Sequence, residues 1–158
     1  MAQAVRDGKN CSGEFMGMVM ANALKMAEAN ACMRRIVAAP TAGSCGVIPA
    51  VFCTYEEFFH VEEEKMIEAM YVAAGIGSVI ASRAFVSGAA GGCQAEIGAA
   101  SAMAAAGLTY VRGGSNEAAG HSAAMALANL LGLVCDPVAG LVEVPCVKRN
   151  VIGAVNAI

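Results

Sequence analysis

Three cysteines in glycine- or proline-broken sequence are the residues of this chain best suited to metal binding or thiol chemistry. Cys93 follows "GAAGG", and Cys135 and Cys146 flank the proline- and glycine-broken stretch "CDPVAGLVEVPCVKRN". Such backbone lets N–H groups and helix ends approach a sulfur and stabilise the thiolate that binds metals. The separations of 42 and 11 residues match no zinc-finger or ferredoxin pattern. An inert, buried thiol therefore remains the alternative at each position.

The other four cysteines have weaker claims to chemistry. Cys11, Cys32 and Cys53 lie in terminal or helical sequence and are predicted to be inert. Cys45 lies in a loop, where it either approaches a ligand or packs into the core. Seven cysteines form an odd, unevenly spaced set, and the opening "MAQAVRDGKN" has no secretory pattern. We therefore expect reduced thiols in the cytoplasm and no disulfide framework.

The composition favours one apolar globular domain or a part of one. The chain has 158 residues, of which 58% are hydrophobic and 15% charged, and its formal net charge is −3. Basic residues do not cluster, so nucleic acid is not an expected partner. Because so much apolar material exceeds the needs of a small core, we expect part of the surface to be covered by a partner or by a further part of the same protein.

One uncharged stretch, residues 118–135, is close to the minimum length of a membrane-spanning helix. It contains His121, Ser122 and Asn129 and is rich in Ala rather than Leu or Phe. These features favour a buried helix of a bundle over a membrane span.

The secondary-structure pattern predicts an all-α helical bundle in which loops bring Cys45, Cys93, Cys135 and Cys146 to helix ends. Alternation typical of strands does not persist anywhere in the sequence. Gly- and Pro-rich breaks are expected at residues 38–49, 86–98 and 135–150. Helices are predicted over 13–37, from about 47, over 94–106 and over 151–158. A further helix is expected after His60, where three glutamates favour a helix start. Another is expected from the N-cap Ser115 to about 131.

Three segments carry a resemblance to a known family: "RIVAAPTAGSCGVIPAV", "GAAGGCQAEIGAASAMAAAGL" and "NLLGLVCDPVAGLVEVPCVKRNVIGAVNAI". They resemble the α chain of iron–sulfur-dependent L-serine dehydratase (L-serine ammonia-lyase), over nearly the whole chain. The resemblance implies an all-helical catalytic domain whose loops converge on a [4Fe–4S] cluster held by Cys93, Cys135 and Cys146. It also implies a β chain or β domain as partner, and an oligomer.

The resemblance further implies that residues 1–158 form one domain, an internal to C-terminal portion of the α-chain catalytic domain. The α region of that family begins upstream of the position of Met1 and continues beyond that of Ile158. One departure is Arg34, which stands where the family usually has Gly.

The chemistry that the resemblance implies is elimination from L-serine. Three thiolates on a four-iron cluster leave one iron open, and that iron is a Lewis acid for the serine carboxylate and β-hydroxyl. Removal of the α-proton and loss of hydroxide then lead to pyruvate and ammonia, a step of amino-acid catabolism that supplies gluconeogenesis. The general base is not identified.

Thr41 and Ser44, in "TAGSCG", are candidate substrate-binding residues. They precede the helix start expected near Val47, where unpaired backbone N–H groups and hydroxyls bind a carboxylate. Simple capping of the helix by the same hydroxyls is the alternative.

Lys148, Arg149 and Asn150 follow Cys146 closely and are the other candidate substrate-binding residues. They are placed to neutralise an anionic cluster or to meet the substrate carboxylate. Side chains on the solvent face of a helix are the alternative.

Among acidic and imidazole groups, Glu96 and Glu143 are candidates for acid–base chemistry. His60 and His121 match no histidine expected from the family and are predicted to be packed or surface residues.

Three alternatives to the serine enzyme remain open at this point. A related cluster-dependent L-cysteine desulfidase would expel sulfide by a similar elimination. A mononuclear zinc site would use the same thiols. An inactive helical fragment or interaction module would carry inert thiols.

Overall fold

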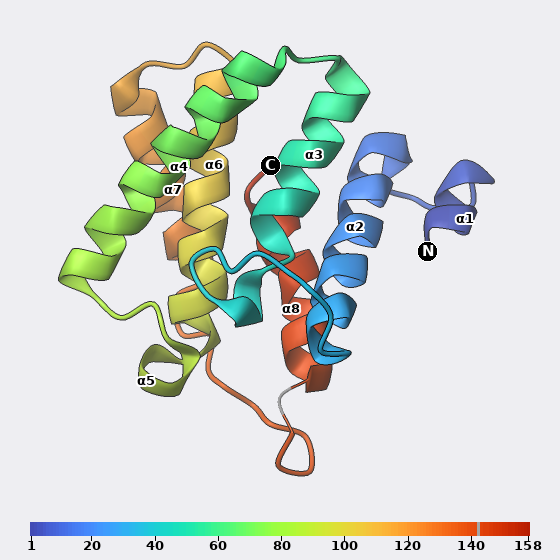
Figure 1. Cartoon of the computed structure of the whole chain (residues 1–158), viewed down its shortest axis with the longest axis vertical. Coiled ribbons are helices and arrows are strands. Elements are labelled where there is room, and N and C mark those ends of the chain that lie inside the picture. Colours follow the sequence, from blue (N-terminus) through green and yellow to red (C-terminus); the bar gives the residue numbers. More distant parts are fainter. Residues whose placement is uncertain (142) are drawn as a thin grey trace.

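A computed structural model describes residues 1–141 and 143–158, and this part of the chain is helical without a strand (Figure 1). The predicted all-α fold is confirmed. Two short elements, η1 and η2, are a 3-10 helix and a π-helix. The elements are α1 (Ala2–Arg6), α2 (Gly13–Ala31), η1 (Ala42–Ser44), α3 (Val47–Phe59), α4 (Glu63–Arg83), α5 (Gly88–Cys93), η2 (Gln94–Gly98), α6 (Ala99–Val111), α7 (Asn116–Asn129) and α8 (Glu143–Asn156).

Helix α6 forms the centre of the bundle. It packs against α3, α4 and α7, and every residue from Ala99 to Leu108 is buried. Most of these residues are Ala, so neighbouring helices approach closely and bury each other without large side chains. The apolar run that the sequence shows is therefore the core of the fold.

Helices α2, α3 and α8 form the other side of the same core. They pack pairwise, and α2 runs beside α8 in Figure 1. Val19 of α2, Val47 and Val51 of α3, and Ala154 of α8 are fully buried in one cluster with residues of α6. This packing brings the start of α8 beside the end of α2 and beside η1, where the site described below is located.

Helix α2 is shorter than predicted. The predicted helix ran to Val37, but α2 ends at Ala31, and Met33 adopts a left-handed φ of 56°. The Met33 side chain is 93% exposed, so continuing the helix would bury no apolar surface there. The connection to α3 therefore spans 32–46 and is longer than the predicted loop.

The predicted breaks around the cysteines contain more helix than expected. Residues 88–98 form α5 and then the π-helix η2, which continues directly into α6. Cys146 lies in α8, which begins at Glu143, so the prediction that it sits on irregular backbone is wrong. Pro145 lies in the first turn of α8, where its missing N–H breaks no hydrogen bond.

The predicted start of α7 is confirmed in atomic detail. The Ser115 hydroxyl accepts a hydrogen bond of 3.1 Å from the Ala118 N–H, as an N-cap does. The helix ends at Asn129, two residues before the predicted end, and Gly132 follows with a left-handed φ of 85°.

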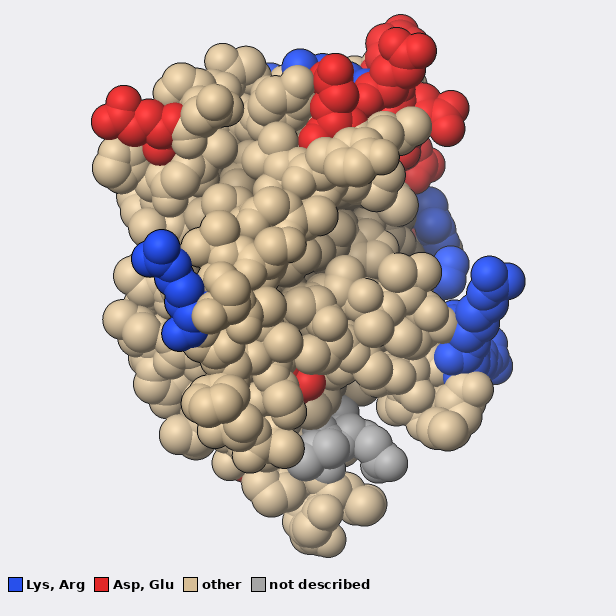
Figure 2. All heavy atoms as spheres, turned by 60° about the vertical axis from the view of Figure 1, so that its left-hand side comes forward, with Lys and Arg blue, Asp and Glu red and all other residues tan. Residues whose placement is uncertain are grey.

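One face of α4 leaves apolar side chains exposed. Met66, Ala69, Ala73 and Gly77 are buried towards the bundle, whereas Met70, Tyr71 and Val79 of the same helix are exposed. Figure 2 shows a broad uncharged surface with charged residues near its margins.

By length and composition alone, α4 is the one described helix that would pass as a membrane span, which is a weak indication. The stretch 118–135 considered from the sequence is not such a helix.

Candidate active site

Cys93 lies at the end of α5, against the loop that carries Cys135. The preceding Gly92 has a left-handed φ of 70°, which favours glycine. A Cβ on Gly92 would lie 3.2 Å from the Leu133 carbonyl oxygen and 3.3 Å from the Cys135 nitrogen. The two cysteine-bearing segments are therefore in backbone contact at this glycine.

Gln94 forms two hydrogen bonds between the Cys93 segment and the loop that carries Cys135. Its backbone N–H donates to the Leu133 carbonyl at 2.9 Å, and its side-chain oxygen accepts from the Gly132 N–H at 2.7 Å. Gln94 was not among the predicted site residues, although its polar side chain directly follows Cys93 in an apolar stretch. The pairing fixes Cys135 next to Cys93.

Arg149 attaches this loop to α8. Its Nη2 lies 2.8 Å from the Asp136 Oδ1, and its Nη1 donates to the Val134 carbonyl. Arg149 is three residues after Cys146, so both lie on one side of α8. The loop with Cys135 is thus held from the Cys93 side by Gly92 and Gln94, and from the Cys146 side by Arg149.

The three predicted ligands affect one another electrostatically. The pKa of Cys146 is raised to about 11, mainly by burial, and further by Cys93, Glu96 and Cys135. The nearby Cys93 thiol thus favours the protonated form of Cys146. The Cys146 thiol therefore has to lose its proton when a metal binds.

The sulfurs do not form a site for a single ion. Within residues 1–141 and 143–158, no three His, Cys, Asp or Glu side chains lie close enough to hold one metal ion. Thiolates of an iron–sulfur cluster bind different irons, so their sulfurs are farther apart than the ligands of one ion. Cluster ligation by Cys93, Cys135 and Cys146 stays a prediction.

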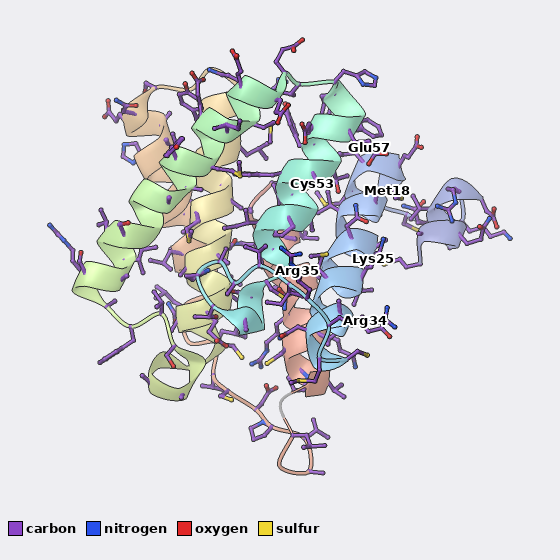
Figure 3. The ribbon with its side chains drawn as sticks, in the orientation of Figure 1. Met18, Lys25, Arg34, Arg35, Cys53 and Glu57 are labelled. Carbon is purple, nitrogen blue, oxygen red and sulfur yellow. The ribbon has the colours of Figure 1, made fainter. Side chains whose placement is uncertain are left out.

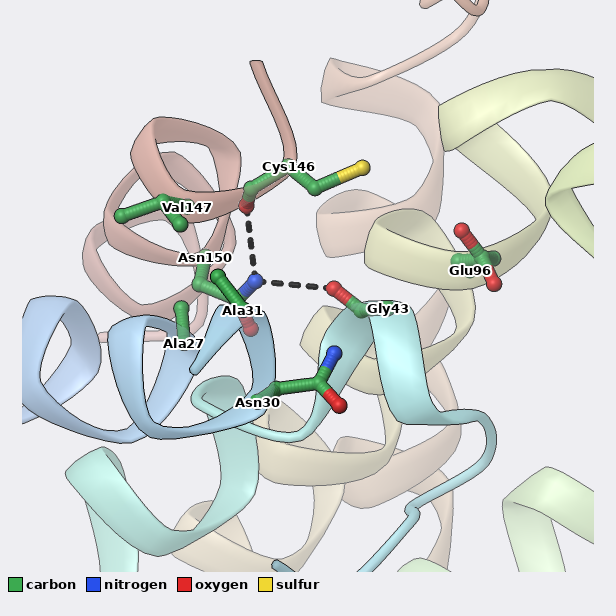
Figure 4. A pocket seen from close by; sticks show the side chains of 8 residues that line it. All are labelled: Ala27, Asn30, Ala31, Gly43, Glu96, Cys146, Val147 and Asn150. Carbon is green, nitrogen blue, oxygen red and sulfur yellow. Dashed lines mark hydrogen bonds between the residues drawn. The ribbon is translucent and has the colours of Figure 1, made fainter. Parts of the chain in front are cut away.

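A cavity of about 280 Å³ opens beside Cys146, between α2, η1, η2 and α8 (Figure 4). Figure 4 shows the Cys146 thiol pointing towards the wall that carries Glu96. The volume suits a small metabolite better than a large ligand. The lining residues are Ala27, Asn30, Ala31, Gly43, Glu96, Cys146, Val147 and Asn150.

Glu96 projects from the π-helix η2 and is held in a narrow space. Its Oε1 accepts a hydrogen bond of 2.8 Å from the Thr41 hydroxyl. A Cβ on either Gly43 or Gly88 would lie 2.5 Å from its Oε2, so a side chain at either position would displace the carboxylate from this place. The sequence identified Glu96 as one of two acid–base candidates, and the structure places it in the cavity.

Thr41 and Ser44 lie beside the cavity but do not cap a helix with their side chains. The Ser44 side chain is fully buried, and its hydroxyl lies 3.3 Å from both the hydroxyl and the carbonyl oxygen of Thr41. The capping alternative is therefore wrong, because neither η1 nor α3 has a side-chain cap.

The backbone donors expected to bind a carboxylate here are largely occupied. The N–H groups of Ser44 and Cys45 donate to the carbonyls of Thr41 and Ala42, and the Gly46 N–H donates to Asn150. Substrate binding by the hydroxyls of Thr41 and Ser44 stays a prediction. The three backbone N–H groups cannot contribute to it while they make these hydrogen bonds.

Asn150 is buried and ties three segments together. Its Oδ1 accepts from the Gly46 N–H at 2.8 Å, and its Nδ2 donates to the carbonyls of Gly43 and Cys146, each at 2.8 Å. Both amide hydrogens are thus used inside the protein. Asn150 lines the cavity, but its amide N–H groups are not free for a substrate.

The neighbouring charged candidates differ in their surroundings. Lys148 is exposed, whereas the Arg149 guanidinium is held by Asp136 and Val134. The side chain of Glu143 lies outside the described residues. The substrate-binding role predicted for Lys148 and Arg149 stays a prediction.

The remaining thiols lie outside the cavity. Cys45 is fully buried with its Sγ 3.7 Å from the Met26 carbonyl, and burial raises its pKa, so it packs into the core. Cys11, Cys32 and Cys53 are exposed. Figure 3 places Cys53 on α3, towards Met18 and Glu57, and Lys25 and Arg34 on α2 and the connection after it.

Both histidines are surface residues, as predicted. His60 is exposed and ends α3 with a left-handed φ of 53°, at the opposite end from Gly46. His121 is exposed and lies 3.7 Å from Glu117 on α7.

The chain belongs to the serine dehydratase alpha chain family, whose profile matches residues 1–158. It is 50% identical over 153 residues to the "Probable L-serine dehydratase, alpha chain" of Bacillus subtilis (strain 168), covering 97% of this chain. It is 48% identical over 150 residues to the "L-serine dehydratase, alpha chain" of Peptoniphilus asaccharolyticus, covering 95% of this chain. With "L-serine dehydratase TdcG" of Escherichia coli (strain K12) it shares 49% identity over 137 residues, or 86% of this chain.

The chain spans only part of these relatives. It covers 51% of the Bacillus subtilis and Peptoniphilus asaccharolyticus proteins and 30% of the Escherichia coli protein. The similarity therefore extends over about half the length of the two alpha chains from Bacillus subtilis and Peptoniphilus asaccharolyticus.

Proposed function

We propose that this chain is the cluster-binding part of an L-serine dehydratase, which converts L-serine to pyruvate and ammonia. The observation that carries the proposal is the attachment of the Cys135 loop to Cys93 on one side and to α8, with Cys146, on the other. The family and the names of the relatives support the reaction.

The donor set fits a [4Fe–4S] cluster on Cys93, Cys135 and Cys146. Three sulfur ligands suit iron–sulfur clusters and zinc alike. Zinc would need all three sulfurs at about 2.3 Å from one ion, and no three side chains in the described ranges meet that closely. A cluster held by these three thiolates would supply an open iron as Lewis acid.

The protein itself would position the substrate and keep the thiols in place. The cavity lined by Cys146, one of the three proposed ligands, has a volume that suits a small amino acid. Thr41 orients the Glu96 carboxylate on one wall, and Asn150 holds the η1 wall against α8. Arg149 holds the Cys135 loop, so that the ligand positions are largely set before metal arrives.

The partners of the complete enzyme are part of the same proposal. A β chain or β domain, an oligomeric assembly and a cytoplasmic location are proposed. The exposed apolar face of α4, with Met70, Tyr71 and Val79, supports contact with further protein.

Anaerobic reconstitution with iron and sulfide tests the proposal directly. We expect the visible absorption and EPR signal of a cluster in the wild type and in Cys11→Ser, and their loss in Cys93→Ser, Cys135→Ser and Cys146→Ser. Stoichiometric zinc without visible absorption, or a colourless iron-free protein with intact helical circular dichroism, would contradict it.

A parallel assay on the complete enzyme identifies the substrate. Pyruvate should form from L-serine faster than from L-cysteine, and prolonged exposure to air should abolish the activity. Faster turnover of L-cysteine would instead indicate a desulfidase.

A further inference from the structure

We propose that the Glu96 carboxylate is the receptor for a primary ammonium group in the cavity beside Cys146. If the proposed function holds, that group is the α-ammonium of L-serine. The role differs from acid–base chemistry, because the carboxylate binds the amine and takes no proton from the substrate.

The charge of the cavity points to a cationic ligand group. The eight lining residues include no Lys, Arg or His, and the ionisable ones, Glu96 and Cys146, are both acids. The nearby cation Arg149 is held by Asp136, and Lys148 is exposed. A cavity walled by one sign of charge attracts the opposite sign, and a carboxylate is the strongest hydrogen-bond partner for an ammonium.

The local geometry fixes the carboxylate in place without neutralising it. Thr41 donates a neutral hydrogen bond to Oε1, and Gly43 and Gly88 leave just enough room around Oε2. None of the ion pairs among the described residues includes Glu96. The carboxylate is therefore oriented by a neutral partner and has no ion-pair partner among the described residues, so a cationic ligand group can pair with it.

The size of the cavity limits the ligand. About 280 Å³ lies just below the range of cavities that bind drug-sized molecules. A small amino acid can place its amine against Glu96 while its other end lies towards Cys146, which faces Glu96 across the space in Figure 4. The expected ligand class is therefore a small compound that carries a primary amine.

The test compares two ligands on the complete, anaerobically reconstituted enzyme that contains this chain. The ligands are L-alanine and propanoate, which is alanine without its amine; neither carries the β-hydroxyl that the enzyme eliminates, so binding can be measured by calorimetry without turnover. The variant Glu96→Gln keeps an acceptor for Thr41 and removes the charge. We expect it to weaken L-alanine binding roughly ten- to a hundred-fold, with the affinity for propanoate and the visible cluster spectrum unchanged. The control Glu57→Gln, an exposed residue of α3, should change neither affinity.

Each outcome decides the proposal. Equal effects of Glu96→Gln on both ligands, or no effect on either, would overturn it. The wild type gives a check that does not depend on the folding of a variant. It should bind L-alanine at least about ten-fold more tightly than propanoate, and equal affinities would overturn the proposal. The proposed function has a separate test: failure to form pyruvate from L-serine would overturn it. Binding that depends on the amine would support the role of Glu96 even in that case.

Discussion

The Arg149 guanidinium lies 2.8 Å from the Asp136 carboxylate and also donates to the Val134 carbonyl. This interaction joins α8 to the loop that carries Cys135. The Arg149 side chain is only 11% exposed, whereas Asp136 is 54% exposed, so the ion pair is partly screened by solvent. Its main effect is the position of the loop.

Replacing Arg149 should therefore weaken metal retention more than it weakens the fold. We expect Arg149→Ala to lower the free energy of unfolding by about 1 kcal/mol, and to speed the loss of iron to a chelator. Arg149→Lys should restore charge without the forked geometry and recover only part of the retention. Lys148→Ala, an exposed neighbour, is the control, and equal iron loss in both alanine variants would contradict the prediction.

The buried amide of Asn150 should be important for stability. Asn150→Ala removes three hydrogen bonds and leaves the Gly46 N–H and the Gly43 carbonyl without that partner. We expect a loss of about 2–3 kcal/mol in the free energy of unfolding, measured with urea. Asn116→Ala, at an exposed position in the first turn of α7, should change it by less than about 0.5 kcal/mol.

Gly92 should tolerate no side chain. Gly92→Ala places a Cβ against residues 133–135 on backbone with a left-handed φ. We expect a loss of about 1–3 kcal/mol in thermal or urea unfolding, together with poorer cluster assembly. Gly120→Ala is the matched control, because a Cβ there meets nothing within 4 Å and lies in regular helix. It should be neutral or raise stability by up to about 1 kcal/mol.

The raised pKa of Cys146 predicts a pH dependence of the metal-free protein. The pKa is about 11 in the fold, compared with 9.0 for an ordinary thiol, mainly because of burial. The folded state therefore holds the proton more tightly, and the stability that this provides is complete below pH 9 and is lost as pH rises towards 11. The difference in unfolding free energy between wild type and Cys146→Ser should shift over this interval in that direction.

Alkylation gives an independent measurement of the same property. Iodoacetamide at about pH 8 should modify Cys146 more slowly than Cys11 or Cys32, because the thiolate is the reactive form. Mass spectrometry of digested protein measures each rate. Faster modification of Cys146 than of the two exposed cysteines would contradict the assigned pKa.

Local sequence signals predicted much of the fold. The helix predicted over 94–106 corresponds to η2 and most of α6, and Ser115 was correctly predicted as the N-cap of α7. The absence of strand-like alternation correctly predicted an all-α fold. These features depend on residues close together in the chain. The end of α2 was missed because Met33 turns the chain where no core is available to extend the helix.

The candidate site was less predictable because contacts between distant residues build it. Thr41 and Glu96 are 55 positions apart, and Gly46 and Asn150 are 104 apart. No local pattern indicates such partners. The sequence therefore indicated Glu96 and Asn150 as polar residues near the cysteines, but not that one is oriented by a hydroxyl and the other joins α8 to η1.

The Asn150 side chain also gives the cavity a mechanical property. Its Nδ2 bonds the carbonyl of Cys146 and the carbonyl of Gly43, and Gly43 in turn borders the Glu96 carboxylate. We expect any displacement of the first turns of α8 to be transmitted through this amide to the opposite wall. Oxidative damage at the sulfurs would then distort the amine end of the cavity as well, so the two ends would fail together.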